Sequence, residues 1–491
     1  MKLEYKYLVA IVSTFGLFMN LLDSTVVNVA IPTLATDFHA STTTIQWVIT
    51  GYLLALAVVI PMAGWVGDRF GTKRSFMAAL VVFTGFSLAC GLAWNIESLI
   101  VFRILQGAGG GMLTPLGTTL LFRAFPPHER SRASALLTIP TTVAPASGPL
   151  LGGLLVEYVS WHWIFFVNVP IGIIGVFCTW RFLREQREEQ PGRFDPAGFV
   201  LAAAGMGALL YGLSEAGVRG FEDVRVLGFL VSSVVILAVF TLVELRIPEP
   251  MLDLRLVRNR LFRACSVTQL LGMTGFAGSL FLLPVVLQSE QGLTPFQSGL
   301  ATFPTAIGVT LFAQPTSRIY HYVGPRRLIV GGLLIAAVMT YWLALIDAGT
   351  SQWEIRIIML LRGCGFGMIL VSLQAATFAT IRHEDTGRAS SLFSAAQMVG
   401  QSLGVAVCAT VLANRLAHHG GALGPQMPAP VRDAAFAAFH DAFLAAVAMT
   451  IVGIVVALLI RDKDAAPSMR PRGAVLAGDD DDFVEMPAIG H

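Results

Sequence analysis

Long apolar stretches separated by short polar loops run through most of the chain. A helix needs about 20 apolar residues to cross the roughly 30 Å hydrocarbon core of a bilayer, and fourteen stretches come close to or exceed this length. Only 13% of the residues are charged, whereas about a quarter is usual in soluble proteins. The sequence therefore predicts an all-α polytopic membrane protein with fourteen spans, at 7–32, 47–66, 76–95, 98–122, 133–158, 163–183, 197–214, 225–245, 263–288, 298–320, 327–346, 352–378, 388–413 and 442–461.

Lysine and arginine are distributed unequally between the two sides of the predicted bundle. Of the 33, two lie inside spans and five lie in loops opposite the termini, which leaves 26 at the termini or in loops on their side. Because positively charged loops remain in the cytoplasm, we expect both termini to be cytoplasmic. The first apolar run is too long for the core of a cleavable signal peptide, so we expect an uncleaved signal anchor.

The sequence disfavours several other classes of protein. The five cysteines lie in apolar spans without paired spacing, so neither a disulfide framework nor a metal site is expected. The glycines at 107–111 lie inside a span rather than in a βαβ unit, and the sequence has no P-loop motif for ATP. We therefore expect no enzyme activity and no cofactor. The formal net charge of +2 gives no reason to expect a nucleic-acid partner.

Two motifs occur once in each half of the chain. Gly71 is followed 253 residues later by Gly324 in a degraded copy of its loop, and Arg103 is followed 259 residues later by Arg362. Paired halves with a substrate site at their mid-membrane interface are typical of secondary transporters. The predicted organisation is a six-helix bundle at 1–190, two inserted helices with cytoplasmic linkers at 191–260, a second six-helix bundle at 261–463 and a disordered tail at 464–491.

A single carboxylate, Asp23, lies in the middle of the first span. A charge at mid-bilayer costs roughly 2.5 to 3.5 kcal/mol, which makes this acid a functional hypothesis, and burial favours the neutral form of an acid, as a proton site requires. Arg103 in the fourth span lies at a depth from which its side chain can approach Asp23, and Gln106 shares its helix face. The alternatives are an acid with a purely structural role and an arginine that extends to the outer surface.

The loop after the second span is short, charged and flanked by glycines. Such a turn can dock on a helix terminus of the other half and hold one conformation, or it can be a solvated loop whose positive charge only sets topology. The residues concerned are Gly64, Asp68, Arg69, Gly71 and Arg74.

The fifth span combines prolines with glycines. Prolines favour bending and glycines permit close helix contact, so this helix could seal the route between the halves against proton leak. An ordinary kinked helix is the alternative. The residues concerned are Pro145, Gly148, Pro149, Gly152 and Gly153.

The motifs around Asp23, Gly64–Arg74, Arg103 and Pro145–Gly153, in this order along the chain, resemble those of the major facilitator superfamily, specifically its fourteen-span drug:proton antiporter branch. The resemblance implies two six-helix bundles plus two extra central helices in a bacterial cytoplasmic (inner) membrane. It also implies protons as the coupling ion, with Asp23 as the proton site, Arg103 as its partner, and Asp68 with Arg69 as the conformational latch. The sequence departs from the pattern of this family at two positions: Ala144 stands where glycine is usual, and His162 stands where arginine is usual.

Spans nine to fourteen contain no acid away from their ends, which disfavours dicationic substrates. We expect neutral, monocationic or zwitterionic amphiphiles, exported by a protein that is functional as a monomer in the lipid bilayer. A dedicated exporter of one metabolite, lipid or siderophore, a nutrient symporter and a transporter-like receptor are alternatives, and the sequence does not indicate a periplasmic adaptor. Candidate cavity residues, each of which could instead face lipid or pack, are Asn20, Trp47, Tyr52, Gln106, Phe276, Phe281, Gln374 and Gln397.

Overall fold

The computed structural model describes residues 4–40, 42–188, 194–247, 252–419 and 427–469. Regular secondary structure in these ranges is helical throughout, with no strand. The first half contains α1 (Tyr5–Asp37), α2 (Thr42–Val59), η1 (Ile60–Met62), α3 (Ala63–Phe70), α4 (Thr72–Gly91), α5 (Ile96–Ala124), η2 (Pro127–Glu129), α6 (Arg130–Tyr158), α7 (Trp163–Phe166) and α8 (Asn168–Phe182).

Two inserted helices and a second half follow. The inserted helices are α9 (Pro196–Arg219) and α10 (Val224–Arg246). The second half contains η3 (Leu254–Arg258), α11 (Arg260–Ser289), α12 (Pro295–Thr302), α13 (Pro304–Val323), α14 (Pro325–Ala344), α15 (Gln352–Phe378), α16 (Thr386–His419), α17 (Ala429–Ala457) and η4 (Ala466–Ser468).

Each of the fourteen predicted spans overlaps a helix, although within the described ranges thirteen helical segments are both long and apolar enough to count as candidate spans. The remaining prediction, 298–320, falls on α12 and α13, which are separated at Phe303. With 20 residues α13 is long enough, but its polar residues Gln314, Arg318 and His321 lower its hydropathy. The fold prediction is therefore confirmed, with one span more polar than the rest.

Helix boundaries follow from local chemistry. Asn95 begins α5 by accepting a 2.8 Å hydrogen bond from the Ser98 backbone N–H, while the Asn95 N–H donates to Ser98 Oγ at 3.3 Å. This reciprocal capping satisfies two of the N–H groups that lack a partner at a helix start. Gly71 (φ 96°) and Gly324 (φ 85°) lie in backbone regions that favour glycine. They let α3 turn directly into α4, and α13 into α14.

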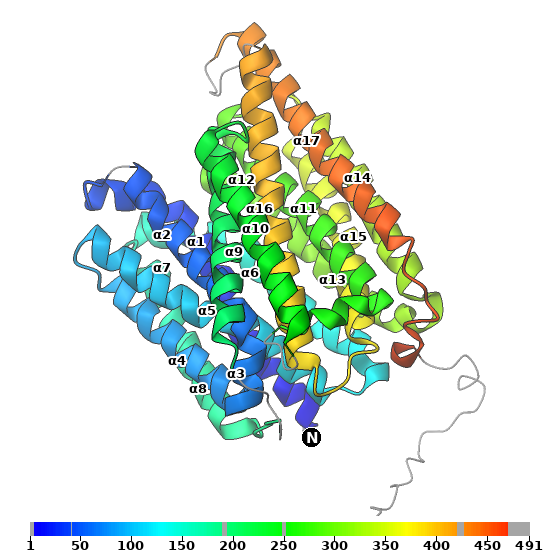
Figure 1. The fold of residues 1–491 in the computed structure, drawn as a ribbon. Helices are drawn as coiled ribbons and strands as arrows, with labels where there is room; N and C mark the ends of the chain where they lie inside the picture. Colours follow the sequence, from blue (N-terminus) through cyan, green and yellow to red (C-terminus); the bar gives the residue numbers. More distant parts are fainter. Residues whose placement is uncertain (1–3, 41, 189–193, 248–251, 420–426, 470–491) are drawn as a thin grey trace, which may run out of the picture.

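The two halves lie side by side and meet at the end that carries the N terminus (Figure 1). At this end Phe122 of α5 stacks on Phe378 of α15, with ring centroids 4.4 Å apart. Both rings belong to a buried apolar cluster with residues of α1, α6, α11 and α16. Toward the other end the helices of the two halves diverge (Figure 1). The structure therefore holds the halves together at the predicted cytoplasmic side.

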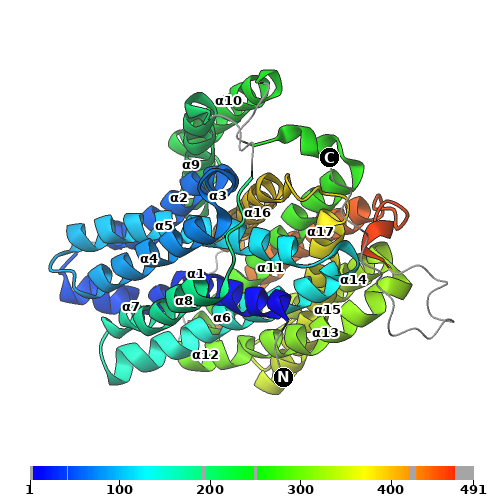
Figure 2. The ribbon, with the colours of Figure 1, turned by 90° about the horizontal axis from the view of Figure 1, so that it is seen from below.

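The inserted helices lie at the edge of the seam between the halves, as Figure 2 shows. Helix α9 packs against α2 of the first half and α16 of the second, and α10 packs on α9. Thr410 of α16 donates a 2.8 Å hydrogen bond to the Ala216 carbonyl of α9.

The segment after α17 continues as part of the second half. Ser468, in η4, is fully buried, and its hydroxyl lies 2.8 Å from the Tyr320 hydroxyl of α13. The predicted disordered tail, 464–491, thus begins with six residues that the structure places, at 464–469, and 470–491 lie outside the described residues.

Candidate functional site

Asp23 and Arg103 form a buried ion pair inside the first half. Asp23 Oδ2 lies 2.5 Å from Arg103 Nη1, and the two residues are 0% and 1% exposed. Asp23 Oδ1 accepts hydrogen bonds from Gln106 Nε2 at 3.0 Å and Asn168 Nδ2 at 2.9 Å. Both carboxylate oxygens are therefore matched by donors. The alternative in which Arg103 extends to the outer surface is wrong, because its side chain points inward to Asp23.

The Arg103 guanidinium makes further contacts besides the one to Asp23. Nε donates to the Val48 carbonyl at 3.1 Å, and Nη1 donates to Gln106 Oε1 at 2.9 Å. The Tyr52 ring centroid lies 4.0 Å from Cζ, a cation–π contact. A buried charge is tolerated when it is paired and hydrogen-bonded, and four helices, α1, α2, α5 and α8, supply these contacts.

Asn168 has no role assigned from the sequence, although it is an amide inside the sixth predicted span, 163–183. It lies at the start of α8, is fully buried, and donates from Nδ2 to Ser87 Oγ at 3.1 Å as well as to Asp23. Ser87 in turn donates to the Phe165 carbonyl at 3.0 Å. An amide inside an apolar span was the signal that could have identified it.

Three of the candidate cavity residues, Gln106, Tyr52 and Asn20, lie in or beside this ion pair without lining open space. The Tyr52 hydroxyl donates to Asn20 Oδ1 at 2.6 Å, and Asn20 Nδ2 donates to Thr114 Oγ1 at 3.3 Å. Tyr52 is 1% exposed and Asn20 is 4% exposed. In this conformation they extend the hydrogen-bond network that surrounds Arg103.

The structure does not gather the other candidates at one place. Trp47 stacks on Tyr211 of α9, with centroids 6.0 Å apart, and Phe276 contacts Arg362 of the second half. Phe281, Gln374 and Gln397 are half-buried on α11, α15 and α16.

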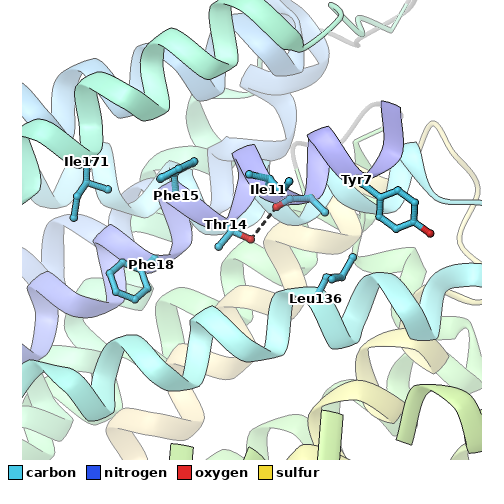
Figure 3. Close-up of a pocket in the computed structure, with 8 residues that line it drawn as sticks. Tyr7, Ile11, Thr14, Phe15, Phe18, Leu136 and Ile171 are labelled. Carbon is cyan, nitrogen blue, oxygen red and sulfur yellow. Dashed lines mark hydrogen bonds between the residues drawn. The ribbon is translucent and has the colours of Figure 1, made fainter. Parts of the chain in front are cut away.

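An apolar groove of about 500 Å³ lies elsewhere (Figure 3). It follows α1 from Tyr7 to Phe18 and is closed by Leu136 of α6 and Ile171 of α8. None of the candidate cavity residues lines it.

At the predicted cytoplasmic end, Asp68 of α3 belongs to a second buried ion pair. Its Oδ1 accepts from Arg123 Nη2 at 2.9 Å. The same Arg123 nitrogen lies 2.9 Å from Glu188 Oε1, and Nη1 donates to Thr72 Oγ1 at 3.0 Å. Arg123, at the end of α5, was not identified from the sequence, because an arginine at a cytoplasmic helix end is already expected from topology.

Helix α3 also docks on the first turn of α16 in the other half. The Gly64 N–H donates to Ser391 Oγ at 3.0 Å, and a Cβ at Gly64 would overlap the backbone of Gly387. Nearby, Ser390 Oγ donates to the Pro115 carbonyl of α5 at 2.9 Å. The geometry is the one that the docking hypothesis requires.

Arg69 and Arg74, the two arginines of the predicted latch, are exposed rather than docked. The Arg74 Nε lies 3.5 Å from Glu185 Oε2. In the neighbouring loop, burial lowers the pKa of His383, and the positive charge of Arg123 lowers it further, so the imidazole favours its neutral form.

The glycines of α6 differ in their surroundings. A Cβ at Gly148 would overlap the Thr25 side chain of α1, two residues after Asp23, whereas a Cβ at Gly153 would meet open space. Gly152 is buried and Pro145 half-buried, while the side chain of Pro149 lies outside the described part. Helix α6 remains one helix from Arg130 to Tyr158 despite its prolines.

Comparison with known proteins gives concordant results. The family model described as Major Facilitator Superfamily matches residues 13–405. The chain is 35% identical over 403 residues to the tetracenomycin C resistance and export protein of Streptomyces glaucescens, covering 82% of this chain and 75% of that protein. It is 34% identical over 401 residues to the multidrug resistance protein B homolog of Mycobacterium tuberculosis, covering 81% and 74%.

A solved structure has the same fold. The human organic anion transporter MFSD10 (TETRAN) superposes with a TM-score of 0.66 at 13% identity, over 92% of this chain and 99% of that chain. At this identity the likeness concerns the fold alone. With the family model covering most of the chain and relatives above 30% identity, this multi-pass membrane protein belongs to the major facilitator superfamily.

Proposed function

We propose that this protein is a proton-coupled exporter of amphipathic small molecules, an antiporter that works by alternating access in a bacterial cytoplasmic membrane with both termini in the cytoplasm. The relatives named for tetracenomycin C export and multidrug resistance support drug export as the direction and substrate class. The observation that carries the coupling is the buried Asp23–Arg103 pair.

The chemistry of this pair explains how a proton could drive a conformational change. Arginine keeps its proton in proteins, so Asp23 is the member of the pair that can exchange one. A proton on Asp23 cancels the carboxylate charge and leaves Arg103 buried without a counter-charge, which is strongly unfavourable. Protonation therefore demands that the cluster open to water or find another anion. Each charge moved through the membrane potential contributes about 2.3 kcal/mol per 100 mV.

The packing near Asp23 gives the pair a means of moving helices. Asp23 is on α1, and Gly148 brings α6 into contact with α1 at Thr25, about half a turn away. Thus a rearrangement around Asp23 would act on the α1–α6 contact. Helix α6 also packs against α13 and α15 of the second half. In this proposal the Asp68–Arg123 pair fixes α3 on α5, and the contact of α3 with α16 at Gly64 holds the cytoplasmic side shut in the conformation shown.

The test is efflux of a panel of amphiphiles from a hypersensitive host, with and without a proton uncoupler. We expect wild-type efflux to stop with the uncoupler, and Asp23→Asn to abolish efflux at wild-type expression. Full efflux by Asp23→Asn would overturn the coupling. Efflux of one compound in a broad panel would favour the alternative of a dedicated metabolite exporter.

A further inference from the structure

Helix α15 carries a second buried arginine whose donors are not all matched. Arg362 is 0% exposed. Its Nη2 donates to the Phe276 carbonyl at 3.1 Å and to Ser279 Oγ. Its Nε and Nη1 are buried without a hydrogen-bond partner among the described residues. A buried donor without a partner is costly, and more so when it is charged.

No ion pair compensates this charge within the described ranges, since none of those found there includes Arg362. Two aromatic rings cover the guanidinium instead. The Phe276 and Phe366 centroids lie 5.0 and 5.4 Å from Arg362 Cζ, and the rings lie 4.0 Å from each other. Cation–π contacts offset part of the desolvation, but buried charges normally also have a charged partner.

The internal repeat shows which partner is missing. Arg362 follows Arg103 by 259 residues, and Phe276 follows Asp23 by 253, the interval that separates Gly71 from Gly324. Phe276 therefore occupies the place in the second half that the acid occupies in the first. The second half has kept the cation and has an aromatic side chain where its counter-charge would be.

We propose that Arg362 is a binding site for the anionic group, such as a carboxylate, of an aromatic organic ligand. The anion accepts hydrogen bonds from the unused Nε and Nη1, and the ring system packs against Phe276 and Phe366. Phe276 is half-buried, so its displacement opens the way to the guanidinium. The statement that this ligand is a transported substrate rests on the proposed function. The statement that the site binds an organic anion is independent of that function. The inference extends the expected substrates to anionic amphiphiles and gives the carboxylate of a zwitterionic one a binding partner.

The test is equilibrium binding to the purified full-length protein in nanodiscs, without a proton gradient. The probes are 1-naphthoate and its uncharged counterpart 1-naphthamide, measured by calorimetry. We expect naphthoate to bind the wild type more tightly than naphthamide. Arg362→Met should weaken naphthoate binding about tenfold or more, the usual loss for a hydrogen bond to a charged group. The matched control is Arg356→Met, because Arg356 is on the same helix beside Trp353, and it should bind as the wild type does.

A second variant keeps the test decisive if Arg362→Met does not fold. Phe276→Asp supplies the missing acid. In the folded variant the new carboxylate should pair with Arg362 and so prevent naphthoate from binding there. Naphthoate binding of wild-type affinity in either folded variant would overturn the proposal. Chloride that stabilises the protein against heat as strongly as naphthoate does would overturn the organic nature of the ligand. A protein that binds naphthoate but fails the efflux test would contradict the export function alone.

Discussion

The two halves of the molecule share their helix packing but differ in their charged contacts. In the first half Arg103 is paired with Asp23, and in the second Arg362 lies against Phe276 with two nitrogens unmatched among the described residues. Buried ion pairs add little net stability compared with apolar packing. An ion pair present in one copy of a repeated fold therefore indicates a role other than holding that fold together.

The ends predicted to be cytoplasmic show a related difference. Asp68 is paired with Arg123 in the first half. At the corresponding place in the second half the residue is His321, whose Nε2 lies 3.2 Å from Ser131 Oγ of α6. The acid of this ion pair is therefore present in the first copy only.

The two halves share the way in which an acidic side chain binds the first backbone N–H groups of a helix. After Gly71, Glu185 accepts hydrogen bonds from the Lys73 and Arg74 N–H groups at 3.1 and 3.3 Å. After Gly324, Asp462 accepts from the Arg326 N–H at 2.9 Å. In both copies an acid just beyond the last helix of the half matches the start of a helix, which is a structural use of charge.

The largest expected difference between the halves is in the stability of two arginine variants. Arg103→Met leaves Asp23 buried without a counter-charge, which costs about 3–5 kcal/mol. Arg362→Met removes a cation that has no anionic partner, so it should leave stability unchanged or raise it. The measurement is the thermal unfolding midpoint of each variant in nanodiscs.

The control is Arg103→Met combined with Asp23→Asn, which should recover part of the loss because the uncompensated charge is gone. A loss in Arg362→Met equal to that in Arg103→Met would remove the contrast. It would mean that Arg362 also has an anionic partner in the folded protein.

The next largest effect is a difference in export between variants of Asp68 in the first half and of His321 in the second. Asp68→Asn breaks the pair that fixes α3 on α5, which should weaken the contact of α3 with α16 and let the predicted cytoplasmic side open more often. Export should fall about tenfold or more, since each 1.4 kcal/mol changes a population tenfold. His321→Asn removes no carboxylate at the corresponding place and should change export little. Initial rates in proteoliposomes measure the first effect.

Spin labels can show whether the loss arises from opening. His128→Cys and Arg382→Cys place labels on exposed loops of the two halves, in a background without the five native cysteines. We expect a longer distance component in Asp68→Asn. Unchanged distances with lost export would argue against a latch.

The sequence predicted the features that depend on depth along one helix. Span lengths follow from hydropathy, and a rise of 1.5 Å per residue places Arg103 at a depth from which its long side chain can approach Asp23. The rotation of each helix about its axis is set by packing and is not readable from one sequence. The sequence therefore does not show that Asn168 contacts Asp23 or that Arg123 contacts Asp68. Nor does it show that Tyr52 and Asn20, two candidate cavity residues, are buried beside Arg103.

The smallest effect tests whether the halves truly share their packing. A Cβ at Gly148 would overlap Thr25 of α1, and a Cβ at Gly404 of α16 would overlap the Thr274 backbone of α11. Overpacking typically costs 1–3 kcal/mol, so Gly148→Ala and Gly404→Ala should lower the unfolding midpoint by similar amounts. Gly153→Ala is the matched control, because its Cβ would meet open space and alanine favours helix by up to about 1 kcal/mol. A penalty in Gly148→Ala alone would mean that close packing, like charge, is specific to the first half.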